Sequence, residues 1–415
     1  MTELERQGAA AKAAGRTLAV AGTERKNAAL EAIASALEAG QEAWLAANGE
    51  DVAAAREAGM RPAMLDRLTL TPERIAGIVA GVREVIALPD PIGEITRETV
   101  RPNGLLIRRR RVPLGVIAII FEARPNVTVD AAALCLKSGN ACILRGGKEA
   151  IRSNRCAERL MRSALAASGL PEDCICLLQS TDRETANELM HLNDYVDVLI
   201  PRGGAGLIRA VARESSVPVI RTGEGVCHVY IDKDADLDMG AKILYNAKCS
   251  RPSVCNAAEC VLLHKSIAEA FLNKALPLLD ERGVELRGDA KILNILGTRA
   301  LPATEEDWDA EYGDYILAVK TVSDVQEAID FINCHGTGHS ECIVTESSQA
   351  AQAFLDRVDA AAVYLNASTR FTDGGEFGLG AEIGISTQKM HARGPMGLEE
   401  LTSYQYVVLG NGQVR

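Results

Sequence analysis

Short apolar segments alternate with helix-like segments from residue 112 onward, and this alternation restricts the fold more than any other feature. The stretch 113–121 is Pro-Leu-Gly-Val-Ile-Ala-Ile-Ile-Phe, which is almost continuously apolar, as a strand covered on both faces of a sheet must be. A helical stretch at 128–138 and a second apolar strand at 141–144 follow. Repetition of this strand–helix order predicts a parallel, doubly wound α/β sheet.

The alternation forms two series along the chain, which predicts two doubly wound α/β domains. We expect the first domain to comprise 1–97 and 113–226, with a helical start over 1–85 and a returning segment near 371–395. We expect the second domain at 227–370, where a new strand–helix series begins. A chain of 415 residues is too long for one small core, which agrees with this division.

Residues 98–112 are a separate feature, a predicted β-hairpin around the turn sequence Pro102-Asn103-Gly104. The C-terminal stretch 400–415 contains another strand candidate at 403–408. Strands that project outside both sheets need a partner to cover their edges. We therefore expect 98–112 and 400–415 to be the oligomerisation strands of a homo-oligomer.

Composition and charge exclude several classes of function. The net charge of −11 makes the chain a poor binder of nucleic acid, and the basic run Arg108–Arg111 fits the exposed part of a strand. No apolar run approaches the roughly 20 residues that a membrane-spanning helix needs, so no membrane partner is expected. Eleven cysteines without zinc-site spacing predict reduced thiols in the cytoplasm and no metal site.

Cys255 lies in the stretch 250–260, a turn-rich loop that leads into an apolar strand. A cysteine in such a loop can present its thiol in a cleft, where backbone N–H groups stabilise a thiolate and later an oxyanion. Cysteine identity alone also fits a small buried residue without a chemical role. The residues by themselves leave both interpretations open.

The motifs around Cys255 resemble the aldehyde dehydrogenase superfamily. The sequence Asp-Ala-Asp-Leu-Asp at 234–238 precedes Cys255 by 17 residues, and Val-Leu-Leu-His-Lys-Ser-Ile follows at 261–267. The stretch that begins at Pro113 and ends at Asn126 is similar to the superfamily strand that leads to an active-site asparagine. The resemblance implies an aldehyde-dehydrogenase-like fold, with Cys255 as nucleophile and Asn126 as the amide that faces the substrate oxygen.

Four longer motifs resemble one branch of the superfamily, the γ-glutamyl phosphate reductases; these motifs are 122–128, 137–140, 251–257 and 335–341. The branch implies NADPH-dependent reduction of L-glutamyl 5-phosphate to L-glutamate 5-semialdehyde through a cysteine thioester, in proline synthesis. It also implies the upstream glutamate kinase as a candidate partner. The chain departs from the branch at Phe331, where histidine is usual.

A second departure concerns the activation of water. Hydrolysing members carry a general-base glutamate twelve residues before the 234–238 motif, but this chain has Thr222 there, and Glu224 is out of register. Without a base to activate water, a thioester is protected from hydrolysis. A CoA-acylating aldehyde dehydrogenase also dispenses with this base, so that activity stays open, as do a catalytically silent scaffold and a displaced base at Glu224.

The resemblance also implies a cofactor site in two loops. The Arg-Gly-Gly-Lys loop after the second strand lines the adenosine ribose, where Arg145 and Lys148 favour NADP(H) by pairing with a 2′-phosphate. A solvated basic loop is the alternative. The turn with Gly203 and Gly204 suits close approach to a pyrophosphate. Glu311 matches the glutamate that holds the nicotinamide ribose.

Five further residues are candidates for substrate binding: Arg124, Arg251, Arg393, His335 and His339. Guanidinium groups match both the substrate carboxylate and the leaving phosphate, and the sequence does not choose among the three arginines. The two histidines flank glycines in a loop before a strand. This placement favours a loop-structuring or substrate-contact role over acid–base catalysis.

Overall fold

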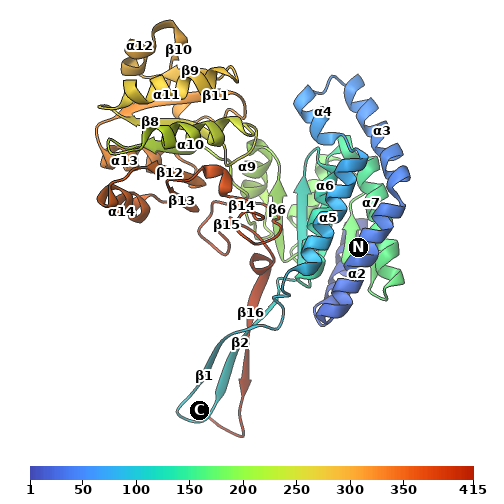
Figure 1. The fold of residues 1–415 in the computed structure, drawn as a ribbon. Helices are drawn as coiled ribbons and strands as arrows, with labels where there is room; N and C mark the ends of the chain where they lie inside the picture. The colour runs from blue at the N-terminus through green and yellow to red at the C-terminus, as the bar shows by residue number, and fades with distance from the viewer. The chain divides into compact units, whose positions relative to one another are not determined.

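The computed structural model describes residues 1–415, except for the side chains of Ala63 and Ala205. The chain separates into two compact units, and Figure 1 labels most of their helices and strands. Unit 1 comprises Met1–Thr222, Gly378–Gly384 and Met396–Arg415, and unit 2 comprises Gly223–Phe377 and Ile385–Pro395.

The boundary after Thr222 lies close to the predicted change at 226, but the predicted returning segment is divided between the units. Within 371–395, only Gly378–Gly384 belongs to unit 1. The physical reason is local pairing: β14 (Ile385–Ser386) pairs with β15 (Gly394–Pro395), and the Gly223 N–H donates to the Ile385 carbonyl at 2.9 Å. The cofactor-binding and catalytic roles of the two units stay predictions.

Unit 1 is built on a parallel four-stranded sheet in the order β5-β4-β3-β6. Its strands are β3 (Val116–Phe121), β4 (Ala141–Arg145), β5 (Ile175–Leu177) and β6 (Val198–Arg202). Every residue of β3 is buried, and Val116, Ala118 and Ile120 join one hydrophobic cluster on one face. Because side chains alternate along a strand, the other three face the opposite side. The apolar run therefore reflects a strand covered on both faces, as predicted.

Helices cover both faces of this sheet. One cluster includes residues of α1 (Glu3–Leu18), α8 (Arg183–Met190) and α9 (Ala205–Glu214). The helices α6 (Pro125–Lys137) and α7 (Ile151–Ala167) also contact the strands, and α2 (Thr23–Ala39), α3 (Gln41–Glu57), α4 (Pro62–Leu68) and α5 (Pro72–Ala87) pack around them. Two single turns also lie in this part of unit 1, η1 (Lys148–Ala150) and η2 (Glu172–Cys174).

Part of the branch-like motif at 137–140 has a structural role in unit 1. The side chain of Asn140 accepts the Gly115 N–H at 2.8 Å and donates to the Leu401 carbonyl at 2.9 Å. The Lys137 ammonium donates to the Ile86 carbonyl at 2.8 Å. Buried polar groups are stable only when they are paired in this way, so these residues hold distant segments together.

The predicted hairpin and the C-terminal strand form one antiparallel sheet in the order β1-β2-β16. Its strands are β1 (Ile95–Val100), β2 (Leu106–Pro113) and β16 (Thr402–Leu409), with η6 (Glu399–Leu401) just before the last. Gly104 adopts φ 85° in the hairpin turn, a conformation that glycine adopts without strain. This sheet extends from the rest of unit 1 as a narrow arm (Figure 1).

Unit 2 contains a parallel seven-stranded sheet in the order β10-β9-β11-β8-β7-β12-β13. Its strands are β7 (Cys227–Ile231), β8 (Ala258–His264), β9 (Glu285–Gly288), β10 (Ala300–Pro302), β11 (Ile316–Val322), β12 (Ser340–Val344) and β13 (Ala362–Leu365). Val261 and Leu263 of β8 belong to one core cluster, and Cys260 and Leu262 belong to the cluster on the other face. The second predicted α/β series is confirmed.

The helices of unit 2 supply these two clusters. One cluster contains residues of α10 (Leu237–Cys249), α11 (Ala268–Asp280) and α12 (Ala290–Leu296), and the other contains residues of α13 (Val325–His335) and α14 (Ser348–Arg357). Three short turns are η3 (Gly297–Arg299), η4 (Glu305–Asp309) and η5 (Thr369–Phe371). Among the helices that the structure describes, none is long and apolar enough to cross a membrane.

Candidate active site

The amino-terminal ends of four neighbouring strands in unit 2 bring several predicted residues to one edge. The sheet order places β11, β8, β7 and β12 side by side. Glu311 precedes β11, Cys255 precedes β8, Gly225 precedes β7 and His339 precedes β12. Because the strands are parallel, their amino-terminal ends lie along the same edge of the sheet.

Cys255 differs from the other cysteines in its exposure. Nine of the eleven cysteines are buried, Cys334 is exposed, and Cys255 has intermediate exposure. Burial raises the pKa of the Cys249 thiol to about 11 and raises the pKa of Cys260 further. The two cysteines that flank Cys255 in sequence therefore stay protonated and poorly accessible. Cys255 is therefore more accessible than either of the cysteines that flank it.

Gly225 lies against the backbone of Cys255. A Cβ at position 225 would lie 1.4 Å from the Cys255 carbonyl oxygen and 2.8 Å from its Cα, so no side chain fits there. The Gly225 N–H donates to the carboxylate of Glu311. Burial of that carboxyl group raises the pKa of Glu311, although the residue as a whole is exposed. Glu311 and Cys255 are thus linked through a single glycine.

A series of buried polar side chains, linked by hydrogen bonds, supports the Cys255 loop. The Cys227 thiol donates to the Cys255 carbonyl at 3.2 Å, and Nδ1 of His339 lies 3.9 Å from the Cys227 sulfur. The same Nδ1 lies 2.8 Å from the Ser340 hydroxyl oxygen. Burial lowers the pKa of His339 to about 4, so the imidazole is neutral near pH 7. His339 therefore supports the loop and has no proton to donate as an imidazolium.

Arg370, which the sequence reasoning missed, binds the Cys255 loop at two points. Its guanidinium donates to the side-chain oxygen of Asn256, the residue after the cysteine, and to the Ser250 hydroxyl at 3.1 Å. The Thr369 hydroxyl donates to the Asn256 carbonyl at 2.8 Å. Arg370 lies 115 residues after Cys255, and no local pattern in the sequence marks it.

Asn126 lies in the first turn of α6 in unit 1, just after β3. Its amide nitrogen donates to the Asp130 carboxylate at 2.8 Å, across one helical turn. Burial raises the pKa of Asp130 to about 6, against the opposing effects of the Asn126 hydrogen bond and the Arg202 charge. An amide nitrogen carries two hydrogens, so one remains for a substrate oxygen. The spacing of four residues was the signal that could have identified Asp130.

The first predicted cofactor loop follows β4. Arg145 donates to the Thr181 carbonyl at 2.7 Å and to the Asp182 carbonyl at 3.2 Å, and its buried Nε has no hydrogen-bond partner among the described residues. The Lys148 side chain is exposed. The exposed Lys148 ammonium, three residues after Arg145, fits a phosphate-bearing ligand.

The second predicted cofactor loop follows β6 and leads into α9. A Cβ on Gly203 would lie 2.5 Å from a carboxylate oxygen of Glu122, and the Gly204 N–H donates to the same oxygen at 3.0 Å. The N-terminus of α9 therefore already holds one carboxylate, as its dipole favours. The loops that contain Arg145 and Gly203 follow the two strands on either side of β3, at the carboxyl edge of the sheet.

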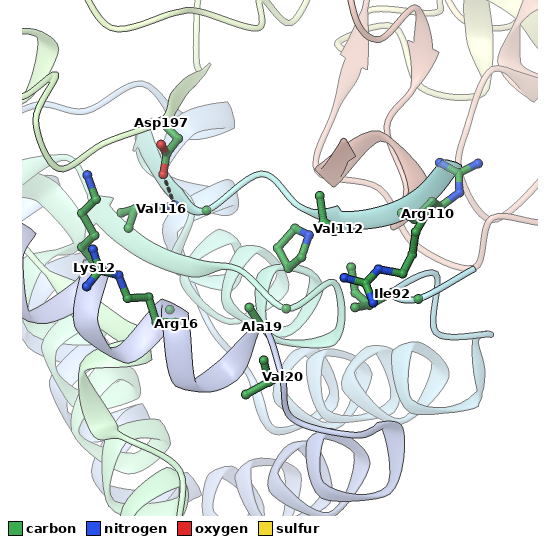
Figure 2. A pocket seen from close by; sticks show the side chains of 15 residues that line it. Lys12, Arg16, Ala19, Val20, Ile92, Arg110, Val112, Val116 and Asp197 are labelled. Atoms are coloured by element: carbon green, nitrogen blue, oxygen red, sulfur yellow. Dashed lines mark hydrogen bonds between the residues drawn. The ribbon is translucent and has the colours of Figure 1, made fainter. Parts of the chain in front are cut away.

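A pocket of about 520 Å³ in unit 1 lies at the opposite edge of the same sheet (Figure 2). Its lining includes Gly115, Val116 at the start of β3, and Asp197 just before β6. The Asp197 carboxylate accepts the Val116 N–H at 2.8 Å, and Lys12 and Arg16 come from α1 (Figure 2). The predicted cofactor loops follow the carboxyl ends of the strands, so this pocket lies at the other end of the sheet from them.

Comparisons with known proteins agree with this architecture. Residues 2–285 and 310–407 match the model of the aldehyde dehydrogenase family. A γ-glutamyl phosphate reductase of Moorella thermoacetica is 57% identical over 413 residues, which cover 100% of this chain and 99% of that protein. The chain belongs to the γ-glutamyl phosphate reductase branch of the aldehyde dehydrogenase family.

Solved structures separate the branch from the wider family. The crystal structure of γ-glutamyl phosphate reductase from Thermotoga maritima is 47% identical, with a TM-score of 0.97 over 100% of both chains. An acetylating aldehyde dehydrogenase from Geobacillus thermoglucosidasius shares only the fold, with 17% identity and a TM-score of 0.71 over 100% of this chain and 97% of that chain. Aldehyde dehydrogenase family membership confirms the predicted fold class and implies a nicotinamide cofactor.

Three other positions singled out in the sequence lie in unit 2, on α13 or beside the 336–338 loop that leads into β12. Nδ1 of His335 lies 2.8 Å from the Asp309 carboxylate, and its ring centroid is 4.3 Å from that of Phe331. Phe331 also packs edge-on against His228 at 5.9 Å, so in this chain the position contributes an apolar ring that packs against the core. Arg393 donates to Asp359 at 2.7 Å and lines a second pocket of about 380 Å³.

The remaining candidates divide between the two units. Arg251 is exposed in the Cys255 loop, whereas Arg124 precedes α6 in unit 1. Thr222 is buried, and its hydroxyl donates to the Pro201 carbonyl at 2.7 Å. A threonine used in this way cannot replace a general-base glutamate. In this aldehyde dehydrogenase family member, the roles of these side chains stay predictions.

Proposed function

We propose that the chain reduces L-glutamyl 5-phosphate to L-glutamate 5-semialdehyde and phosphate, with NADPH as reductant, in the second step of proline synthesis from glutamate. The substrate comes from the names of full-length relatives such as the reductase of Moorella thermoacetica, 57% identical. The observation on which the proposed chemistry depends is the partial exposure of Cys255. Its loop packs against Gly225, and the cysteines that flank it in sequence are buried.

The reaction begins with the Cys255 thiolate, whose proton has passed to solvent. Its sulfur attacks C5 of the acyl phosphate, the bond from C5 to the phosphate oxygen breaks, and phosphate leaves with that electron pair. The backbone N–H of Cys255 and the second amide hydrogen of Asn126 stabilise the oxyanion of the tetrahedral intermediate, which forms before phosphate leaves. The product of this half-reaction is a thioester on Cys255.

When bound, NADPH would supply a hydride for transfer to the thioester carbon. The carbonyl then re-forms as the bond between C5 and the Cys255 sulfur breaks, which releases the aldehyde and restores the thiolate. Thr222 stands where hydrolysing relatives activate water, and its hydroxyl is bonded to a backbone carbonyl. The thioester therefore survives until it is reduced or, in the reverse direction, attacked by phosphate.

The cofactor preference and the setting belong to the same proposal. Arg145 and Lys148 favour NADP(H) over NAD(H), because a 2′-phosphate needs a cation where a 2′-hydroxyl does not.

The arm β1-β2-β16 exposes Val100, Tyr406 and Val408, which supports its role as a homo-oligomer interface. Eleven free thiols suit the reducing cytoplasm. Light scattering on a Tyr406→Asp variant tests the interface, because a buried charge would shift the mass toward the monomer.

The decisive assay runs the reaction in reverse. Glutamate semialdehyde should reduce NADP⁺ only when phosphate or arsenate is present, and other aldehydes should react far more slowly. CoA in place of phosphate tests the CoA-acylating alternative. Turnover that requires CoA, or turnover that needs neither acceptor, would contradict the proposed function.

A further inference from the structure

Two arginines lie at the Cys255 loop, although the chain as a whole carries a net charge of −11. Arg251 belongs to the loop itself, four residues before the cysteine, and its side chain is exposed. Arg370 reaches the loop from η5. The substrate of the proposed reaction is an anion whose phosphoryl group is attached to the carbon that Cys255 attacks. The position of these two cations therefore matters for the chemistry.

The loop contacts fix the position of the Arg370 guanidinium. It donates to the Asn256 side chain and to the Ser250 hydroxyl, so it spans the segment that contains Cys255. The Asn256 amide returns two hydrogen bonds, to the Arg370 carbonyl at 3.2 Å and to the Thr372 carbonyl at 2.9 Å. A guanidinium has five N–H donors, and these two contacts leave others for a ligand.

The surroundings of Arg370 shift its pKa in both directions. Burial is the largest cause that lowers the pKa of Arg370, and the neighbouring Arg251 is the next. Asp373, Cys255 and Glu376 oppose this effect. Two like charges held together beside a nucleophile cost free energy until an anion neutralises them. The thiolate supplies one negative charge, and a phosphoryl group supplies up to two more.

We propose that Arg370 and Arg251 bind the phosphoryl group of the acyl phosphate and stabilise it as it leaves. This inference rests on the proposed function and names the residues that recognise the leaving group. As the bond from C5 to oxygen breaks, negative charge grows on the phosphate oxygen, where planar guanidinium groups bind best. In the reverse direction the same pair holds inorganic phosphate while its oxygen attacks the thioester carbon and the bond to sulfur breaks.

Alkylation of Cys255 tests the charge pair without the cofactor or the substrate. Iodoacetate is an anion and iodoacetamide is neutral, and both react with the thiolate, so the ratio of their rates cancels the fraction of thiolate present. The exposed Cys334 is first replaced by serine to remove its background reaction. Arg370→Met should lower the ratio of iodoacetate to iodoacetamide rates about 5- to 10-fold.

A matched control separates this local effect from a general change of charge. Arg357→Met removes the same charge from the exposed end of α14 in the same unit and should leave the ratio unchanged. Arg251→Met serves as a second test variant, because its exposed side chain carries little of the loop's structure, and it should lower the ratio as well. Unchanged ratios in both test variants would overturn the proposal.

Reverse-direction kinetics separate this inference from the proposed function. Arg370→Met should raise the KM for phosphate at least about tenfold while the KM for the semialdehyde changes little, and Arg370→Lys should recover part of the loss. If the wild-type enzyme shows no dependence on phosphate, the proposed function fails. If the wild type depends on phosphate but both arginine variants keep its KM, only the assignment of these two arginines fails.

Discussion

The two parallel sheets carry their predicted functional loops at opposite edges. In unit 1 the loops with Arg145 and Gly203 follow the carboxyl ends of strands, where open α/β sheets usually bind ligands. In unit 2 the Cys255 loop precedes the amino end of β8. Two sheets of the same architecture thus carry the predicted cofactor loops at the carboxyl ends of strands in one unit and the predicted nucleophile at the amino end of a strand in the other.

The two edges also differ in the helix ends that lie at them. The loop at Gly203 leads into the N-terminus of α9, which favours negative charge. The Cys255 loop follows the C-terminus of α10, whose partial charge is negative and gives no help to a thiolate or a phosphate. Positive charge at this edge must therefore come from side chains, and Arg251 and Arg370 are the residues placed to supply it.

The largest expected effect tests whether the amino edge of unit 2 is the chemical edge. Cys255→Ser should lower kcat at least about 10³-fold, because a hydroxyl is a far weaker nucleophile than a thiolate. NADPH binding, measured by fluorescence titration, should be unchanged if the cofactor loops belong to the other edge. Cys334→Ser, at the exposed cysteine, is the control and should keep full activity. Normal turnover in Cys255→Ser would show that the chemistry does not take place at the amino edge of unit 2.

Gly225→Ala tests how the nucleophile loop is positioned. The added Cβ would overlap the Cys255 carbonyl oxygen, at 1.4 Å, so the loop must move. A displacement of about 1 Å at the reacting atom costs on the order of 10²-fold in rate, which steady-state assays would detect. Gly49→Ala on α3 is the control, because nothing lies within 4 Å of its Cβ, and it should leave activity unchanged. Equal activity in the two variants would show that the loop tolerates movement.

Local patterns in the sequence predicted most of the fold, because β3 and its neighbours are buried on both faces and must be continuously apolar. Cys255 and Asn126 were identified through motifs that lie within a few residues of each. Gly225 and Arg370 were not identified, because they lie 30 residues before and 115 residues after Cys255 and contact its loop only in the folded chain. The returning segment was misplaced in part because β14 and β15 are two residues long and show no periodicity.

A smaller effect is expected at Asp130, which orients Asn126 in unit 1. The folded-state pKa, raised to about 6 by burial, lies above the ordinary value of 3.8, so this group's contribution to stability is complete below pH 3.8 and is lost as the pH rises through 6. Asp130→Asn should therefore stabilise the protein at pH 8 by about 1 to 3 kcal/mol, and less at pH 4. Urea unfolding at both pH values measures the difference.

The same variant should lose activity. Without the carboxylate the Asn126 amide is less firmly oriented, so kcat should fall about tenfold. Wild-type activity should decline below about pH 6, as Asp130 becomes protonated, and the variant should lack this decline. Asp66→Asn, at an exposed ion pair with Arg74 in the same unit, is the control and should change neither property. A variant that is stabilised at pH 8 but fully active would leave Asp130 as a buried carboxylate with no positioning role.

The smallest effect concerns the carboxyl edge of unit 1. Lys148 is exposed, so its pairing with a 2′-phosphate is screened by solvent and contributes less than a buried pair. Lys148→Ala should raise the KM for NADPH about 3- to 10-fold and leave the KM for NADH and the value of kcat unchanged. A loss shared equally by both cofactors would mean that the lysine contacts the pyrophosphate or the fold instead. A loss in kcat would mean that Lys148 affects the chemical step and not only the binding of the cofactor.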